Sequence, residues 1–254
     1  MSIESRVDRP QVPLNPKHRG QGISLRQAAL SAGFALLAMS FAAPFADKYA
    51  YPRLVIAGNI GQTVQNIATH RGLFVAMTLA YLVNFICDLV VAWALYVLLT
   101  PVNRALSLLT AWFRLLYTAI ALAGAFKLVT VYNLIDTPYD LTLFGPVQLN
   151  AQVKLLVDSF RSDWNMALVL FGIHLVLLGW LVARSGYIPR LIGVYLSLDG
   201  VAWIVNSLSS TLFPGANLAF LYVFFLAELA LMIWLLVRGW RIPAPDESLA
   251  ENGI

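Results

Sequence analysis

The chain has little charge for its length. Only 12% of its 254 residues are Asp, Glu, Lys or Arg, whereas about a quarter of the residues of an average soluble domain are charged. This composition leaves too few charged side chains to cover a soluble surface. The apolar residues, 59% of the chain, form long blocks instead of alternating stripes. Blocks of about 18 or more apolar residues are typical of membrane-spanning helices.

The chain has one cysteine and none of the usual metal-binding motifs. The single cysteine, Cys87, lies inside an apolar block, which excludes an internal disulfide and a cysteine-based zinc site. The chain has no HExxH, ExxH or paired-cysteine motif, no P-loop and no dinucleotide-binding fingerprint. A serine hydrolase is not indicated either, because Ser185 lies in a turn far from His174. We therefore expect no metal and no cofactor.

The net charge of +4 does not indicate nucleic-acid binding, because no basic patch with interleaved aromatic residues occurs. The Lys and Arg residues instead flank the apolar blocks, and in membrane proteins such residues are enriched in cytoplasmic loops. Ten lie on the side of the termini and five on the opposite side. This excess predicts a multi-pass protein of the inner or plasma membrane with both termini in the cytoplasm. The ten are Arg6, Arg9, Lys17, Arg19, Arg26, Arg104, Arg184, Arg190, Arg238 and Arg241, and the five are Lys48, Arg53, Arg71, Lys154 and Arg161.

Six apolar blocks predict an all-α fold, a polytopic membrane bundle of six transmembrane helices. The membrane domain covers residues 24–241 in this prediction, between a flexible cytoplasmic tail at 1–23 and a short one at 242–254. The first block is too long for a signal peptide and follows a long charged segment, so we expect a retained helix. The six predicted spans are 25–45, 73–99, 105–132, 164–183, 191–212 and 218–237.

Two outer connections contain amphipathic stretches. Along residues 146–164, the apolar residues Leu149, Val153 and Phe160 share one helical face, and the polar residues lie elsewhere. Residues 60–68 form a shorter version of the same pattern. Both stretches predict interfacial helices that lie flat on the outer membrane surface. They would serve as a lid over the bundle or, alternatively, as a gate or a lipid-contact surface.

The feature that most indicates function is a set of five ionisable residues inside the predicted spans. Each lies 11 to 14 residues from its nearest cytoplasmic turn, roughly 16–21 Å along a helix and thus near the bilayer centre. Charges at this depth are costly and by default indicate function. The five residues of this buried polar layer are Asp88, Arg114, His174, Asp199 and Glu228.

Matched depths on neighbouring helices suggest partners within the layer. We expect Asp88 to form an ion pair with Arg114, and His174 to pair with Asp199. Glu228 is then the remaining acid, which either shares one of these partners or is protonated. Four further residues follow the layer at helical spacing and are expected to extend it or to line a cavity: Asn84, Tyr117, Trp203 and Asn206.

Several functions fit such a layer. Acid and histidine chains relay protons in transporters, so a carrier for a small molecule or lipid is favoured. An intramembrane enzyme that uses the Asp, His and Glu side chains remains an alternative. A structural or sensing protein is another, because polar side chains also hold helices together. The expected partners are membrane lipids and a small-molecule or lipid ligand; the sequence sets no oligomeric state.

Some stretches of the chain form a distinctive pattern. In chain order, these stretches are Asp88, 98–104, 112–114, 171–174, 184–190 and 228–230. In this pattern the chain resembles, over residues 25–240, the bacterial and archaeal domain-of-unknown-function 4386 family. The turns Pro-Val-Asn-Arg and Arg-Ser-Gly-Tyr-x-Pro-Arg are its most specific parts. The resemblance implies a six-helix membrane fold with an acid, Arg, His and Glu at Asp88, Arg114, His174 and Glu228, and it implies no activity. The tail before residue 24 is longer than the family pattern.

Overall fold

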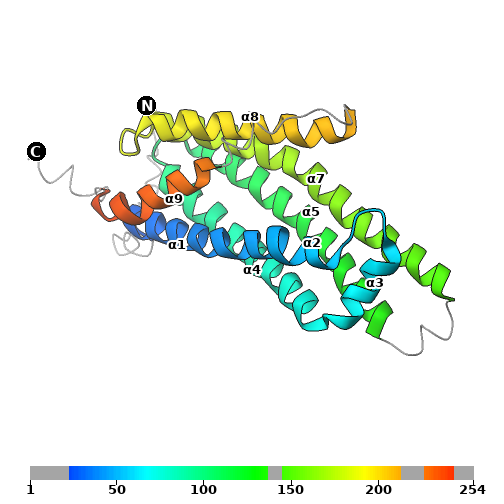
Figure 1. Cartoon of the computed structure of the whole chain (residues 1–254). Helices are drawn as coiled ribbons and strands as arrows, with labels where there is room; N and C mark the ends of the chain where they lie inside the picture. Colours follow the sequence, from blue (N-terminus) through cyan, green and yellow to red (C-terminus); the bar gives the residue numbers. More distant parts are fainter. Residues whose placement is uncertain (1–22, 137–144, 213–225, 243–254) are drawn as a thin grey trace, which may run out of the picture.

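The computed structural model describes residues 23–136, 145–212 and 226–242, and within these ranges the fold is entirely helical. Long helices lie side by side in an elongated bundle (Figure 1). The predicted all-α fold class is therefore confirmed. The helices are α1 (Leu25–Pro44), α2 (Tyr51–Leu54), α3 (Ile60–Thr69), α4 (Arg71–Leu99), α5 (Arg104–Asp136), α7 (Pro146–Arg184), α8 (Arg190–Leu212) and α9 (Ala227–Arg238).

Five helical segments of the described chain are long and apolar enough to cross a membrane. A span needs about 20 residues, and α4, α5 and α7 have 29, 33 and 39. These lengths identify a multi-pass membrane protein. The sixth predicted span, 218–237, lies partly outside the described residues, and α9 covers its second half.

The first helix is longer than the sequence predicted. It begins with a capping box in which Ser24 and Gln27 bond each other's backbone. It then passes through Pro44 into a π-helical stretch, Phe45–Ala50, and continues directly into α2. Single π-helical turns within α-helices are rare and often occur at functional sites. The segment Leu25–Leu54 is thus one 30-residue helical span, where the prediction ended at residue 45.

The amphipathic stretch 146–164 is not a separate interfacial helix, so that prediction was wrong. It forms the first half of α7, because no Gly or Pro interrupts the chain between Val147 and Phe171. Its apolar face, which includes Val153 and Phe160, is buried against the bundle. The stretch 60–68 does form its own helix, α3, which Asn59 caps and which buries Ile67.

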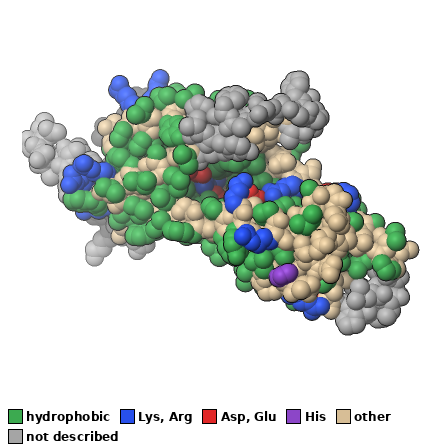
Figure 2. All heavy atoms as spheres, viewed as in Figure 1, with side chains coloured by type: hydrophobic (Ala, Val, Ile, Leu, Met, Phe, Trp, Pro, Cys, Tyr) green, Lys and Arg blue, Asp and Glu red, His purple; other side chains and the backbone are tan. Residues whose placement is uncertain are grey.

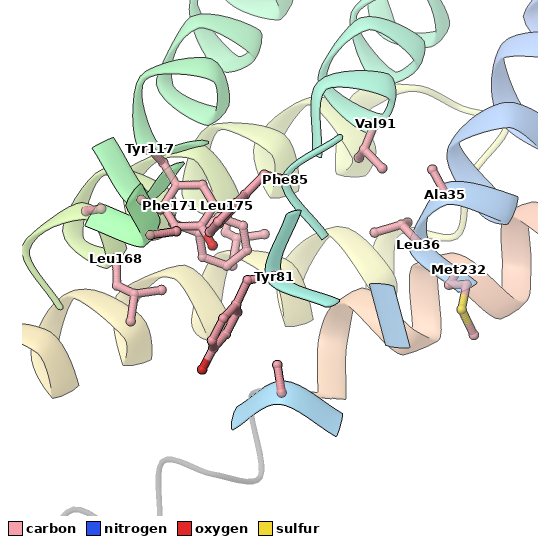
Figure 3. Packing of buried hydrophobic residues seen from close by; sticks show 14 of the residues in the cluster. Ala35, Leu36, Tyr81, Phe85, Val91, Tyr117, Leu168, Phe171, Leu175 and Met232 are labelled. Carbon is pink, nitrogen blue, oxygen red and sulfur yellow. The ribbon is translucent and has the colours of Figure 1, made fainter. Parts of the chain in front are cut away.

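The core is one cluster of packed side chains, and Figure 3 shows residues from two parts of it. Tyr81, Phe85, Tyr117 and Phe171 belong to one part, and Leu36 and Met232 belong to the other. Large apolar side chains also cover the outside of the bundle: Phe41, Trp112 and Phe126 are more than 60% exposed. An outer surface this apolar is suited to contact with lipid, and its exposure to water would be unfavourable.

Helices α7 and α8 pack more closely than side chains normally allow. Four glycines line the contact, and a Cβ added to Gly172 would lie 2.6 Å from the carbonyl oxygen of Gly200. A Cβ added to Gly179 would lie 2.4 Å from the carbonyl oxygen of Gly193. Small residues of this kind let membrane helices approach backbone to backbone.

This contact predicts a large effect from a single methyl group. Gly179→Ala would overlap backbone atoms of α8 and should destabilise the protein by about 1–3 kcal/mol. Gly72→Ala is the matched control, because a Cβ there meets nothing within 4 Å. The free energy of unfolding in mixed detergent micelles measures both. Equal stabilities for the two variants would contradict the close packing.

The ends of the described chain meet at one end of the bundle. Gly239, just after α9, lies so near α1 that an added Cβ would be 3.1 Å from the Cβ of Ala29. The turn between α4 and α5 and the turn between α7 and α8 lie at this same end (Figure 1). We refer to it as the turn end.

Candidate functional site

Each of five helices contributes one ionisable residue to the middle of the bundle. Asp88 comes from α4, Arg114 from α5, His174 from α7, Asp199 from α8 and Glu228 from α9. The first four are at most 1% exposed. The Glu228 side chain is 23% exposed, so the layer is accessible chiefly through this residue.

Arg114 is the centre of this network. Its guanidinium bonds the Asp88 carboxylate through Nε at 2.8 Å and Nη2 at 2.7 Å. Its Nη1 donates to Oε1 of Glu228 at 2.9 Å. One buried cation is therefore shared between two carboxylates from different helices. Such charge-assisted bonds are among the strongest in proteins. The Asp88–Arg114 ion pair agrees with the partner expected from depth, and Glu228 shares the same arginine.

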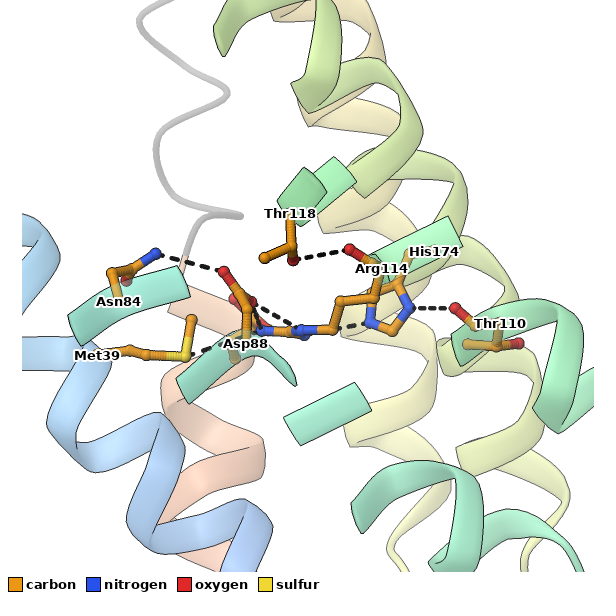
Figure 4. A network of polar contacts seen from close by, with 8 residues as sticks. Met39, Asn84, Asp88, Thr110, Arg114, Thr118 and His174 are labelled. Carbon is orange, nitrogen blue, oxygen red and sulfur yellow. Dashed lines mark hydrogen bonds and ion pairs between the residues drawn. The ribbon is translucent and has the colours of Figure 1, made fainter. Parts of the chain in front are cut away.

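Two further residues extend the network at its ends, as Figure 4 shows. Asn84 donates through Nδ2 to the second carboxylate oxygen of Asp88 at 3.3 Å. Nε2 of His174 lies 3.2 Å from Nη1 of Arg114, and its Nδ1 lies 2.9 Å from the carbonyl oxygen of Thr110. Because Arg114 can only donate, Nε2 accepts and Nδ1 carries the ring proton. The contacts therefore fit a neutral imidazole.

The predicted pairing of His174 with Asp199 was wrong. Both ring nitrogens of His174 are occupied by Arg114 and Thr110. Depth alone does not fix the direction in which a side chain points. Gly172 faces α8, and His174, two residues later, lies about 200° further around α7 and therefore faces α5.

Asp199 is buried and makes no ion pair with another described residue. It is 1% exposed, and its Oδ1 has no hydrogen-bond partner among the described residues. The charge of Glu228 is close enough to act on it. Two acids on neighbouring helices thus act on each other through their charges, while Arg114 is bound to Asp88 and Glu228. A buried carboxylate in this position is costly as an anion.

Aromatic rings form one wall of the layer. Tyr117 packs against Phe171 with a centroid distance of 4.9 Å, and Trp203 meets Phe171 edge-on at 6.0 Å. Arg114 lies 5.4 Å above the Phe171 ring. Phe171 is thus a central contact that the sequence analysis did not single out, although it lies one turn before His174. Asn206 is half-buried, and its backbone carbonyl oxygen accepts a hydrogen bond from the Ser209 hydroxyl.

A second charged cluster, which the sequence analysis missed, lies between the π-helical stretch and α7. Arg161 donates to Asp47 at 2.8 Å and lies 4.0 Å above the ring of Tyr51. The charges of Asp47 and Arg161 also act on the buried Tyr81. Arg161 was counted as a loop charge and Asp47 fell in a predicted loop, because the predicted spans ended at residue 45 and began at residue 164. We refer to this group as the outer cluster.

The polar layer has more acids than bases. Asp88, Asp199 and Glu228 carry carboxyl groups, and among the described residues Arg114 is bonded to two of them, Asp88 and Glu228. With a neutral His174, full ionisation would leave two uncompensated negative charges in the bundle interior. The Arg114 guanidinium already lies between Asp88, Glu228 and His174. In the described part of the chain, no group of three or more His, Cys, Asp or Glu residues is arranged to hold a metal ion.

Removing the shared cation should strongly destabilise the protein. Arg114→Met leaves the buried Asp88 and the partly buried Glu228 without their cation, which we expect to cost about 3–5 kcal/mol. Adding Asp88→Asn and Glu228→Gln to this variant should restore part of the loss. Lys154→Met is the control, because the Lys154–Asp158 pair is exposed and should contribute about 0.5 kcal/mol or less.

The free energy of unfolding in mixed micelles measures each variant. A cost for Arg114→Met as small as that for Lys154→Met would show that the layer does not depend on the charge of Arg114.

Comparison with known proteins assigns the chain to a family. The family model "Domain of unknown function (DUF4386)" matches residues 31–239. An uncharacterized protein of Archaeoglobus fulgidus is 32% identical over 158 residues, which cover 62% of this chain and 80% of that protein. No solved structure matches the chain. The family model covers most of the chain, so the protein belongs to the DUF4386 family.

Proposed function

We propose that this DUF4386 protein is a membrane carrier for a small molecule or lipid, and that its central polar layer binds and releases protons. The observation that carries this proposal is the buried Asp199, which lies near Glu228 while Arg114 is bound to Asp88 and Glu228. Intramembrane carboxyl and histidine groups arranged in this way relay protons in pumps and transporters.

The charge balance supports a proton site. Three carboxyl groups and one guanidinium can be neutral together only if two further positive charges enter the layer. Protons are the smallest cations that can do so without enlarging a packed interior, and they bind directly to carboxyl oxygens. Asp199 accepts one proton in this proposal, and Asp88 or Glu228 shares the other.

The layer also has a route to the surface. Glu228 is partly exposed, whereas the Arg114 to which it bonds is fully buried. Figure 2 shows charged side chains of both signs gathered in a hollow across the middle of one face. A proton or a polar ligand that reaches the exposed part of Glu228 would be connected through its bond to Arg114 with the buried network.

A structural role is the second candidate, favoured by the many hydrogen bonds within the network. Thr110 on α5 bonds His174 on α7, and Arg114 on α5 bonds both Asp88 on α4 and Glu228 on α9. Such bonds hold membrane helices together at about 0.6 kcal/mol each. They account for Asp88 and Arg114, but they leave the buried Asp199 unexplained.

Asp199→Asn separates the two roles. If Asp199 binds a proton, acidification of the wild-type protein should produce an infrared carbonyl band of a protonated carboxyl group, and the variant should lack part of it. Asp158→Asn is the control, because this acid is exposed and pairs with Lys154. Proton uptake per protein, measured with a pH dye, should also fall in Asp199→Asn alone.

Identical infrared bands and proton uptake in the wild type and Asp199→Asn would rule out a proton at Asp199. If the variant then differs only in its free energy of unfolding, the polar layer is structural. Neither result requires the transported molecule to be known.

We also propose that the turn end faces the cytoplasm, since ten Lys and Arg residues lie on that side and five on the other. A cysteine at Ser185, in a protein whose Cys87 is changed to Ser, should react with a membrane-impermeant maleimide in inverted vesicles. A cysteine at Asp158 should react in right-side-out vesicles. The reverse pattern would invert the topology.

A further inference from the structure

A cavity of about 420 Å³ lies at the turn end, where the two turns of the bundle meet. One wall is the turn between α4 and α5, and the other is the end of α7 with the turn that follows it. We refer to this cavity as the turn pocket. It lies outside the polar layer and is lined by Val102, Asn103, Trp180, Arg184, Ser185 and Tyr187.

Hydrogen bonds fix the walls of the turn pocket. The Tyr187 hydroxyl donates to the carbonyl oxygen of Leu98 at 2.5 Å and so ties one turn to the other. Burial raises the pKa of Tyr187 to about 12, so this hydroxyl keeps its proton at neutral pH. The Ser185 hydroxyl bonds the backbone on both sides of its own turn, and Gly186 adopts a positive φ of 76° there. The pocket is thus bounded by two turns that are bonded to each other.

The charged residues of the two described turns that bound the turn pocket are all positive. The guanidinium of Arg184 lies 4.3 Å above the ring of Trp180, which holds it at the wall. Arg184 makes no ion pair with any described residue. Arg104 and Arg190 follow the two turns, and no Asp or Glu occurs in residues 98–107 or 180–192.

A hydrogen-bond donor stands next to this charge. The Asn103 side chain uses its oxygen to accept the backbone N–H of Leu106. Its amide nitrogen is therefore left with two donor hydrogens. A guanidinium on one wall and a primary amide on the other wall of the same cavity form a donor set for a phosphate oxygen, since Arg binds phosphate through parallel hydrogen bonds.

The depth of the turn pocket matches the headgroup region. Asn103 lies 11 residues from Arg114 along α5, which is about 16 Å in a helix. If the polar layer is at the bilayer centre, this distance ends near the edge of a hydrocarbon core about 30 Å thick. Trp180, at the pocket wall, is a residue type enriched at this boundary.

We propose that the turn pocket binds a phosphate group, and that its source is the headgroup of an anionic phospholipid. Arg184 and Asn103 contact the phosphate oxygens, and Trp180 holds Arg184 in place. The volume exceeds that of a free phosphate ion and accommodates a glycerol phosphate headgroup, and basic pockets between membrane helices take such headgroups. The site is separate from the polar layer, so it does not depend on proton binding there.

The test measures binding of short-chain phosphatidylglycerol to the purified full-length protein in neutral detergent. Arg184→Gln should weaken binding about fivefold, the effect of one Arg beside an anionic lipid. Val102→Phe should weaken it as well, because it fills the pocket and leaves every charge unchanged. Arg238→Gln is the matched control, since this arginine is exposed at the turn end but does not line the pocket.

Inorganic phosphate and short-chain phosphatidylcholine distinguish the sources. Failure of millimolar phosphate to compete with phosphatidylglycerol, together with weak binding of phosphatidylcholine, supports a lipid headgroup. Competition by phosphate as effective as that by the lipid would overturn the lipid source and assign the pocket to a soluble phosphate compound. Equal binding by the wild type, Arg184→Gln and Val102→Phe would overturn the site itself, and so would equal losses in Arg184→Gln and Arg238→Gln.

Discussion

The buried guanidinium of Arg114 is the constraint that the arrangement of the bundle depends on. A permanent charge inside hydrocarbon is tolerated only when close partners replace water. Those partners come from three other helices: Asp88 on α4, His174 on α7 and Glu228 on α9. A sliding of any of these helices by one turn, about 5 Å, would break a bond to Arg114. The arginine therefore fixes the axial register of four helices.

The other helices are positioned by packing. Glycines bring α8 against α7 so closely that backbone atoms meet, and this contact sets the rotation of both helices. It turns His174 toward α5, because that residue lies about 200° around α7 from Gly172. Asp199 then has no histidine to pair with and lies beside Glu228. The charge imbalance of the layer thus follows from the close glycine packing.

These two constraints explain what the sequence could and could not predict. Residue counting along each helix placed Asp88 opposite Arg114, since axial depth follows from helix rise alone. The rotation of α7 and α8 about their own axes depends on the glycine contacts between them, which counting residues does not give. The predicted pairing of His174 with Asp199 was wrong for this reason. The continuity of residues 146–184 was missed, because an apolar face can lie on lipid or on protein. The outer cluster was missed for the same reason, since Arg161 lies in that continuous helix.

The two proposed sites have opposite electrostatic character and lie at different depths along the bundle axis. The polar layer has three acids around Arg114, whereas the turn pocket has Arg184 with Arg104 and Arg190 nearby and no acid in either turn. Three arginines at one end raise the free energy of any cation that approaches the layer from that side. An anionic headgroup in the turn pocket would neutralise part of this barrier, whereas an empty pocket would leave it in place. Lipid composition would then govern how readily protons exchange with Asp199 from the turn end, although none of the five residues of the polar layer lines the turn pocket.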